Sequence, residues 1–326
     1  MLYQLSYRAA VMAKRRVALS GRKYSRRPRA RNGAPTFHAF SLPAMPVRLL
    51  LLVLGLLTAA PLALAFARGD GQLALYAVPG AVLLAVALVF KPELDWAYYT
   101  RRPADLDAPV VKLLEAKRPR WYDELPEADR LRLRQRTHLT VLGLDFKPQT
   151  QEETELPGDF AALLAAQLAR LTWRLAPKHA IPFPYENVVV YPHPFPSRQF
   201  PHDFHASELY DEDGVVLLSL HQALPGTLDP QEYFNVALYE WVRACMRAWG
   251  TTSADGLPTW EGALREMLGY EERWVREGIG LPAEAIDGAA VLQVLRLDFP
   301  SAFAKTYPSL AVVLADQLKP RESREA

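Results

Sequence analysis

The sequence contains a single cysteine, Cys245, among its 326 residues. One thiol cannot form a disulfide within the chain, and it cannot supply a cysteine-rich metal site. Both features are therefore excluded. A reducing compartment is compatible with this composition, although one cysteine does not establish it.

Acidic residues are missing from the first 69 positions, where Asp70 is the first to appear, while residues 1–48 carry eleven Lys and Arg. The whole chain has a net charge of +2, so the part after residue 48 carries about −9. Nucleic-acid binding requires a basic surface. The acidic body therefore argues against a nucleic-acid partner.

The basic arm, residues 1–45, shows no hydrophobic periodicity, and we expect it to be disordered. A transit peptide has a similar composition. Another alternative is that translation starts at Met45, immediately before the first apolar run, in which case the arm is not made.

Two uncharged apolar runs follow, over residues 49–67 and 72–90, separated only by a short polar turn. As a helix each would be roughly 28 Å long, close to the hydrocarbon thickness of a bilayer. We therefore predict a transmembrane helical hairpin with its linker over residues 46–102. The alternative is a signal peptide followed by a buried helix.

Lys and Arg flank this hairpin on both outer sides, whereas the turn has only Arg68, offset by Asp70. The positive-inside rule then places both termini in the cytoplasm, at an inner or plasma membrane. The residues expected to form an interfacial aromatic belt after the second run are Trp96, Tyr98 and Tyr99.

The soluble part, residues 103–326, has the pattern of an α+β domain that is mostly helical with a small β-sheet. Apolar spacing and capping signals predict helices over 125–144, 158–175 (with Asp159 as N-cap), 229–250 (with Asp229 as N-cap) and 259–278, and a mainly helical last 45 residues. β-branched runs bounded by turn residues predict strands within 185–195 and 211–220.

One helical stretch, "NVALYEWVRACMRAWG" at 235–250, has the outline of an H-E-x-x-H zinc-peptidase helix without its histidines. In that motif two histidines at i and i+4 bind one zinc ion, and the glutamate takes a proton from the metal-bound water. Here Tyr239 and Arg243 hold the histidine positions around Glu240. Tyrosine is a poor zinc ligand at neutral pH, and arginine has no lone pair to donate.

The surroundings of this helix resemble the Mlc titration factor A family of cytosolic zinc-dependent peptidases. That family has a vYP-x-x-F strand, a G-E-A-W turn, a vvLSW strand, the H-E-F-A-H-x-L-D helix, an N-G-x-P turn and a C-terminal E-x-F-F-E-x-P segment. The matching segments here, in the same order, are "VVVYPHPF", "HASELYDEDGVVLLSL", "NVALYEWVRACMRAWG", "DGLP" and "LDFPSAFAKTYPSLAVVL". The resemblance spans roughly residues 120–318 and implies a zincin-like domain.

Carried over by position, the resemblance places the first zinc ligand at Tyr239, the second at Arg243 and the third at Val294, with Gln293 and Leu295 beside it. Only Glu240, at the general-base position, matches the family. No histidine follows His221, so shifting the alignment restores no ligand. Two interpretations of Glu240 stay open: an ion pair with Arg243, three residues later, or simple solvent exposure.

Four histidines around the strand region offer a different metal site. They are His193, His202, His205 and His221. Loops rich in proline and aromatic residues also collect histidines without binding metal, so this set supports only an alternative in which zinc is relocated.

These observations lead to one hypothesis and two rivals. The leading one is a membrane-anchored, catalytically inactive relative of these peptidases that needs no cofactor and acts as a regulatory module by binding a protein or peptide at the cytoplasmic face. The resemblance makes a regulatory partner plausible, because the family is named for sequestering a transcriptional repressor. The rivals are an active metallopeptidase with a relocated or non-standard zinc site and a purely structural membrane protein.

The Lys and Arg asymmetry generates a prediction about topology. Reporters fused at residue 40 and at residue 326 should both be cytoplasmic, and a reporter inserted at Gly69 should be external, because positive flanks stay on the cytoplasmic side. The measurement is the activity of a compartment-sensitive reporter at each position. An external residue 326 would contradict the hairpin or its orientation.

Overall fold

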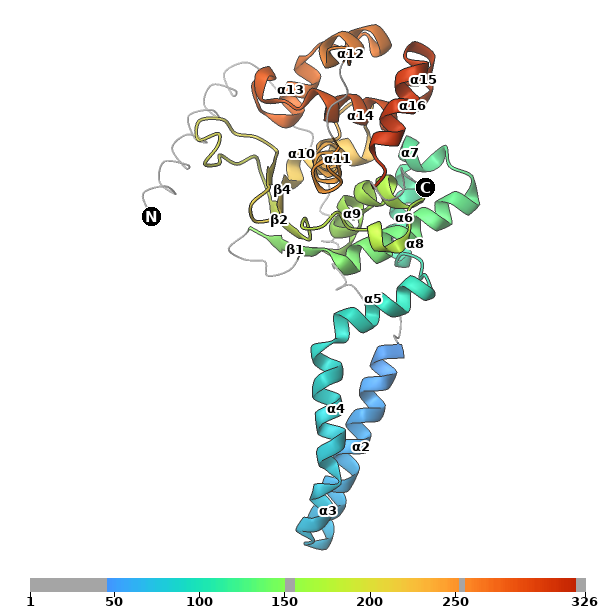
Figure 1. Ribbon diagram of the computed structural model, residues 1–326, viewed down its shortest axis with the longest axis vertical. Coiled ribbons are helices and arrows are strands. Elements are labelled where there is room, and N and C mark those ends of the chain that lie inside the picture. Colours follow the sequence, from blue (N-terminus) through green and yellow to red (C-terminus); the bar gives the residue numbers. More distant parts are fainter. Residues whose placement is uncertain (1–45, 150–155, 252–255, 321–326) are drawn as a thin grey trace, which may run out of the picture. The chain divides into compact units, whose positions relative to one another are not determined.

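The computed structural model describes residues 46–149, 156–251 and 256–320 (Figure 1). The expectation of a disordered arm over residues 1–45 lies outside this part of the chain. The described residues are mostly helical and contain a mixed four-stranded sheet. They confirm an α+β composition dominated by helix, preceded by two long apolar helical segments.

The apolar runs form α2 (Pro46–Arg68), α3 (Gly71–Leu75) and α4 (Ala77–Val89). Helices α2 and α4 pack against each other, and an added Cβ atom at Gly80 of α4 would lie 2.8 Å from the Thr58 hydroxyl of α2. The spans are 20 and 19 residues long, and only 11% and 17% of an 18-residue stretch within each is buried. By length and composition, both segments could cross a membrane.

The second apolar run is interrupted at Tyr76, so the single helix expected over 72–90 is two helices. Pro79 has no N–H to donate to the carbonyl oxygen of Leu75, four residues earlier. At the break, the N–H of Tyr76 donates to the carbonyl oxygen of Leu73, only three residues earlier, at 3.2 Å. This break lies close to the turn that follows α2.

The helix after the hairpin, α5 (Lys91–Arg101), packs against α8 (Glu127–Gly143). Tyr99 is only 4% exposed, and its ring centroid lies 4.8 Å from that of His138. The partly buried rings that join the same cluster are Trp96 and Tyr98. The expected aromatic belt is therefore wrong for Tyr99, because apolar side chains of α8 bury its ring inside the protein.

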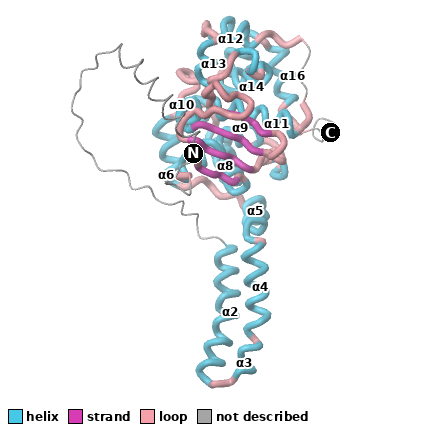
Figure 2. Tube along the Cα trace, turned by 90° about the vertical axis from the view of Figure 1, so that its left-hand side faces the viewer, coloured by secondary structure: helices cyan, strands magenta, loops and turns pink. Residues whose placement is uncertain are grey.

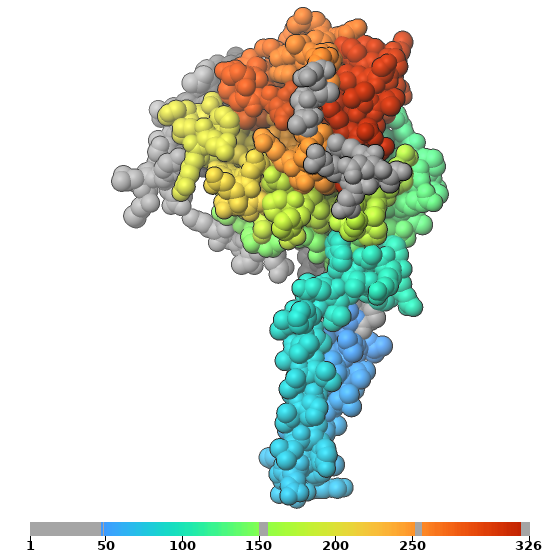
Figure 3. Space-filling view, viewed as in Figure 1, coloured from blue at the N-terminus to red at the C-terminus, as the bar shows by residue number. Residues whose placement is uncertain are grey.

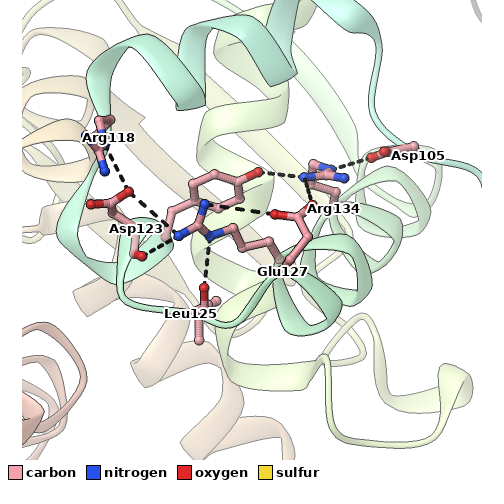
Figure 4. A network of polar contacts seen from close by, with 8 residues as sticks. Asp105, Arg118, Asp123, Leu125, Glu127 and Arg134 are labelled. Carbon is pink, nitrogen blue, oxygen red and sulfur yellow. Dashed lines mark hydrogen bonds and ion pairs between the residues drawn. The ribbon is translucent and has the colours of Figure 1, made fainter.

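Short helices α6 (Ala108–Lys117) and α7 (Arg120–Asp123) precede α8. Arg134 of α8 donates its Nε to Asp105 at 2.8 Å and its Nη1 to the Tyr122 hydroxyl at 2.7 Å (Figure 4). Arg130 donates to the carbonyl oxygen of Asp123 at 2.6 Å. These charge-assisted bonds tie α8 to α7 and to Asp105, which lies before α6.

The strands are β1 (Asp145–Pro148), β2 (Asn187–Tyr191), β3 (Ser207–Tyr210) and β4 (Val215–Ser219), in the order β1-β2-β4-β3. β1, β2 and β4 are parallel, and β3 pairs antiparallel with β4 as an edge strand. The two strands predicted from sequence are β2 and β4. β1 and β3 were not predicted, because four residues give too short a period-2 pattern.

One face of the sheet is covered by helices (Figures 1 and 2). Alternate side chains of β2 and β4, among them Val188 and Val216, are fully buried in the main core. Helix α9 (Gly158–Thr172) contributes Leu164 and Leu168 to that core, as its nearly continuous apolar sequence predicts. Its expected cap is wrong: Pro157 is the N-cap residue, and the chain continues through η1 (Pro177–His179).

Helix α10 (Leu220–Leu228) is followed by a turn and then by α11 (Val236–Ala248). The helix predicted from Asp229 is therefore wrong at its start. Asn235 provides the N-cap, because its side chain accepts a hydrogen bond from the N–H of Leu238 at 3.1 Å. Gly226 of α10 lies against the backbone just before α11: an added Cβ atom would be only 2.2 Å from the carbonyl oxygen of Phe234.

The C-terminal region contains α12 (Trp260–Leu268), α13 (Arg273–Ile279), η2 (Ala283–Ala285), α14 (Gly288–Asp298), α15 (Pro300–Thr306) and α16 (Pro308–Gln317). Helix α14 packs on α11 and α12, while α15 packs on α12, α14 and α16, and the space-filling view shows these C-terminal segments gathered together (Figure 3). The single helix expected over 259–278 is two helices, because Gly269 has a positive φ of +69° and ends α12.

Two glycines with positive φ provide a matched test of the packing between the end of α13 and the loop before β3. At Gly280 (φ +84°) an added Cβ would lie 2.4 Å from the carbonyl oxygen of Phe204, whereas at Gly269 it would meet nothing within 4 Å. Gly269→Ala should cost about 1 kcal/mol from backbone strain alone. Gly280→Ala should cost at least twice as much in thermal unfolding. Equal losses would contradict the close approach.

Candidate functional site

Helix α11 lies at the centre of the domain, in contact with α9, α10, α14 and strands β3 and β4. Most of its residues are buried, including Tyr239 and Glu240. The side chain of Arg243 is 22% exposed. α11 therefore lies in contact with both the sheet, through β3 and β4, and α14.

Glu240 is fully buried and forms an ion pair with Arg243. The Nη1 of Arg243 donates to Oε1 of Glu240 at 2.6 Å. Of the two interpretations left open by the sequence, the ion pair is confirmed and solvent exposure is wrong. Three residues of helix place both side chains on one face, and burial of the carboxylate requires a partner there.

Asp287, the N-cap residue of α14, joins this pair. Its backbone N–H donates to the Tyr239 hydroxyl at 3.0 Å, and its Oδ2 lies 4.0 Å from Nε of Arg243. The guanidinium of Arg243 also lies over the ring of Tyr239, 5.6 Å from the centroid. Tyr239, Glu240, Arg243 and Asp287 thus form one contiguous polar cluster.

Val294, which the resemblance assigns to the third ligand, is a fully buried part of the apolar core. It lies seven residues after Asp287 on the same chain, a rise of about 10 Å along a helix. The polar contacts to Tyr239 and Arg243 come from Asp287 instead. Its neighbour Gln293 points elsewhere, donating to the carbonyl oxygen of Leu314 at 2.7 Å.

Burial and charge set the protonation states of the cluster. Burial raises the pKa of Tyr239 well above its usual range, so the phenol is neutral. Burial alone would lower the pKa of Arg243, but Glu240, Tyr239 and Asp287 together raise it, so the guanidinium stays charged. Burial also raises the pKa of Glu240, and the nearby positive charge of Arg243 counteracts part of that rise.

These states do not fit a catalytic zinc ion. A neutral phenol is a weak donor, and a protonated guanidinium has no lone pair. Only the two carboxylates, Glu240 and Asp287, have the right chemistry, whereas catalytic zinc is held by three protein ligands. Arg243 brings a fixed positive charge to the same place, where a divalent cation would be repelled.

The four histidines do not form one site. The rings of His193 and His221 lie 5.8 Å apart at exposed positions, and His202 is also exposed. His205 is fully buried, and its Nε2 lies 3.1 Å from Oε2 of Glu208. Within the described ranges, His, Cys, Asp and Glu side chains do not gather in a group of three or more that could hold a metal ion.

A cavity of about 500 Å³ opens beside the cluster. Arg243 and Asp287 form part of its wall, and Arg247 and Trp260 form another part. Sequence analysis did not identify Asp287, Arg247 or this cavity. The one available signal was the Asp-Gly pair at 287–288 ahead of an apolar helical run, which is typical of a helix N-terminus.

Comparison with protein-family models and with curated proteins found no match for this chain.

The buried ion pair predicts a large effect of removing one partner. Arg243→Met should destabilise the protein by about 3–5 kcal/mol, because Glu240 would be left buried without a compensating charge. Glu240→Gln combined with Arg243→Met should recover most of this loss. The measurement is denaturant unfolding of the purified protein in detergent, with tryptophan fluorescence as the signal.

The same variant should show a defined pH dependence. Burial holds the folded-state pKa of Glu240 above its unfolded value of about 4.3, and Arg243→Met removes the charge that opposes this rise. Stability is then greatest below the unfolded pKa and falls as pH rises through the folded pKa. The deficit relative to the unmodified protein should therefore grow from pH 5 to pH 8.

Arg276→Met is a suitable control, because Arg276 and Glu272 form an exposed pair at 3.0 Å. Its cost should stay within about 1 kcal/mol at every pH. A pH-independent loss in Arg243→Met, equal to that of the control, would contradict the assignment of Glu240 as a buried charge.

Proposed function

We propose that this protein is a membrane-anchored, non-catalytic relative of zinc-dependent peptidases with a zincin-like domain, and that it binds a protein or peptide at the cytoplasmic face. The observation that carries the proposal is the replacement at Tyr239 and Arg243. The two helix positions where such peptidases hold zinc are occupied by a neutral phenol and by a guanidinium paired with Glu240.

The position of Arg243 supports a replaced site rather than an unrelated helix. Its guanidinium lies between the carboxylates of Glu240 and Asp287, as a cation bound there would. A positive charge on the chain stabilises the buried carboxylate without a metal. The scaffold therefore keeps its electrostatic balance while losing the group that activates water.

A binding role also needs a surface that can receive a ligand. The cavity beside Arg243 has about 500 Å³ and combines charged with apolar walls. This lies in the size range of small-ligand sites, about 300–1,000 Å³. The two apolar spans provide the attachment that keeps the domain at a membrane.

Zinc content is the first test of this proposal. The full chain, purified in detergent, should contain far less than one zinc per molecule and show no peptidase activity that a chelator abolishes. A catalytic zinc site requires three protein groups with free lone pairs, and Tyr239 and Arg243 do not supply them. Stoichiometric zinc retained after substitution of all four candidate histidines would contradict the proposal. Those histidines are His193, His202, His205 and His221.

Restoring ligands tests the geometry. In Tyr239→His with Arg243→His, Asp287 would supply a third ligand, and we expect stoichiometric zinc binding by titration. Adding Asp287→Asn should weaken that binding by at least tenfold, whereas adding Val294→Glu should not strengthen it. The opposite pattern would show that the alignment placing the third ligand at Val294 is correct. Recovery of activity is a separate matter, because histidine ligands also need partners that orient them.

A further inference from the structure

The cavity beside the cluster lies where three helices meet: the C-terminal half of α11, the start of α12 and the start of α14. Its apolar wall is formed by Met246, Leu257, Pro258, Trp260 and Leu292. Its charged wall is formed by Arg243, Arg247, Glu261 and Asp287. A ligand that fits must therefore combine an apolar group with a charged group.

Two helices of nine and eleven residues, α12 and α14, begin on this wall. The first N–H groups of a helix have no acceptor within it, and they favour negative charge. The Thr259 side chain accepts a hydrogen bond from the N–H of Gly262, and the Asp287 side chain accepts one from the N–H of Ala290. The N–H groups of the first two residues of each helix are not used by these caps, and all four residues line the cavity.

The two arginines add donors at the same place. Nε of Arg243 is buried and has no hydrogen-bond partner within the described part of the chain, although Asp287 lies 4.0 Å away. Arg247 is 60% exposed, and its ion pair with Asp211 is loose, at 3.6 Å. Arg247 can therefore turn toward a ligand without leaving a buried charge behind.

The charge balance of the wall selects among anions. Arg243 and Arg247 are offset by Glu261 and Asp287, so the lining is close to neutral. A dianion such as phosphate would meet two carboxylates at short range. A single carboxylate that lies between Arg247 and the helix N-termini, with an apolar side chain next to it, has the charge and the shape that the walls require.

We propose that this cavity binds the C-terminal residue of a partner protein or peptide, with a preference for an apolar terminal side chain. The terminal carboxylate accepts hydrogen bonds from Arg247 and from the first N–H groups of α12 and α14, while the terminal side chain packs on Trp260 and Leu292. This inference rests on the proposed peptide-binding function and specifies which end of the peptide is recognised.

The test uses two libraries of N-acetylated hexapeptides with randomised sequences, one ending in a free carboxylate and the other in a carboxamide. Each is passed over the immobilised full chain in detergent, and retained peptides are identified by mass spectrometry. We expect the free acids to be retained at least tenfold more than the amides. The retained pool should be enriched in Leu, Ile, Val, Met and Phe at the last position.

Variants test whether the cavity is responsible. Arg247→Gln should lower retention of the free acids at least fivefold and leave retention of the amides unchanged. Arg247 is exposed, so this change should not affect folding. Arg132→Gln is the matched control, since Arg132 is 69% exposed on α8 and pairs only loosely, at 3.5 Å, with Asp129. It should retain peptides like the unmodified protein.

The outcomes separate the two proposals. Equal retention of acids and amides would overturn C-terminal recognition and leave peptide binding standing. Failure to retain any peptide would overturn both. Preference for the free acids that survives Arg247→Gln would place carboxylate recognition elsewhere and overturn the assignment to this cavity.

Discussion

The buried carboxylate of Glu240 is the constraint on which the centre of this domain depends. A charged group with no exposed surface is tolerated only when an opposite charge and hydrogen bonds accompany it. Arg243 supplies that charge from the same helix at 2.6 Å, and Asp287 approaches the same guanidinium from the start of α14. One guanidinium thereby serves carboxylates on both helices, which links α11 to the beginning of α14.

A second buried polar group holds the other end of α14. Asp298, its last residue, pairs with Arg170 of α9 at 2.8 Å. Arg170 also donates to Gln167, which accepts a hydrogen bond from the N-cap residue of α11, Asn235, at 3.0 Å. Helix α14 is thus tied by charge at its start to α11 and at its end to α9, while apolar side chains fill the space between. Such an arrangement pre-forms the cavity wall, so a ligand need not order it on binding.

The proposed loss of zinc and the proposed gain of a binding site depend on the same residue. In a zinc peptidase the cation is removable and activates water, whereas a guanidinium on the chain is permanent and activates nothing. Arg243 neutralises Glu240 on its buried side and faces the cavity on the other. On the proposed function, such a scaffold would still bind a peptide without cleaving it, and two apolar helices long enough to cross a membrane precede it.

The sequence by itself determined the features set by composition and short-range periodicity. These are the two apolar spans, strands β2 and β4, helix α8 and the i, i+3 spacing that pairs Glu240 with Arg243. Tertiary structure alone decided the others. Asp287 is 47 residues from Glu240 along the chain, and only packing of α14 on α11 brings it to the cluster. The start of α11 shifted from Asp229 to Asn235 because Asn235 is the residue whose side chain caps the helix and also bonds Gln167. Counting along the sequence assigned a ligand position to Val294, but burial places that residue in the apolar core. Contacts between distant segments depend on how helices pack, and local sequence patterns do not predict that packing.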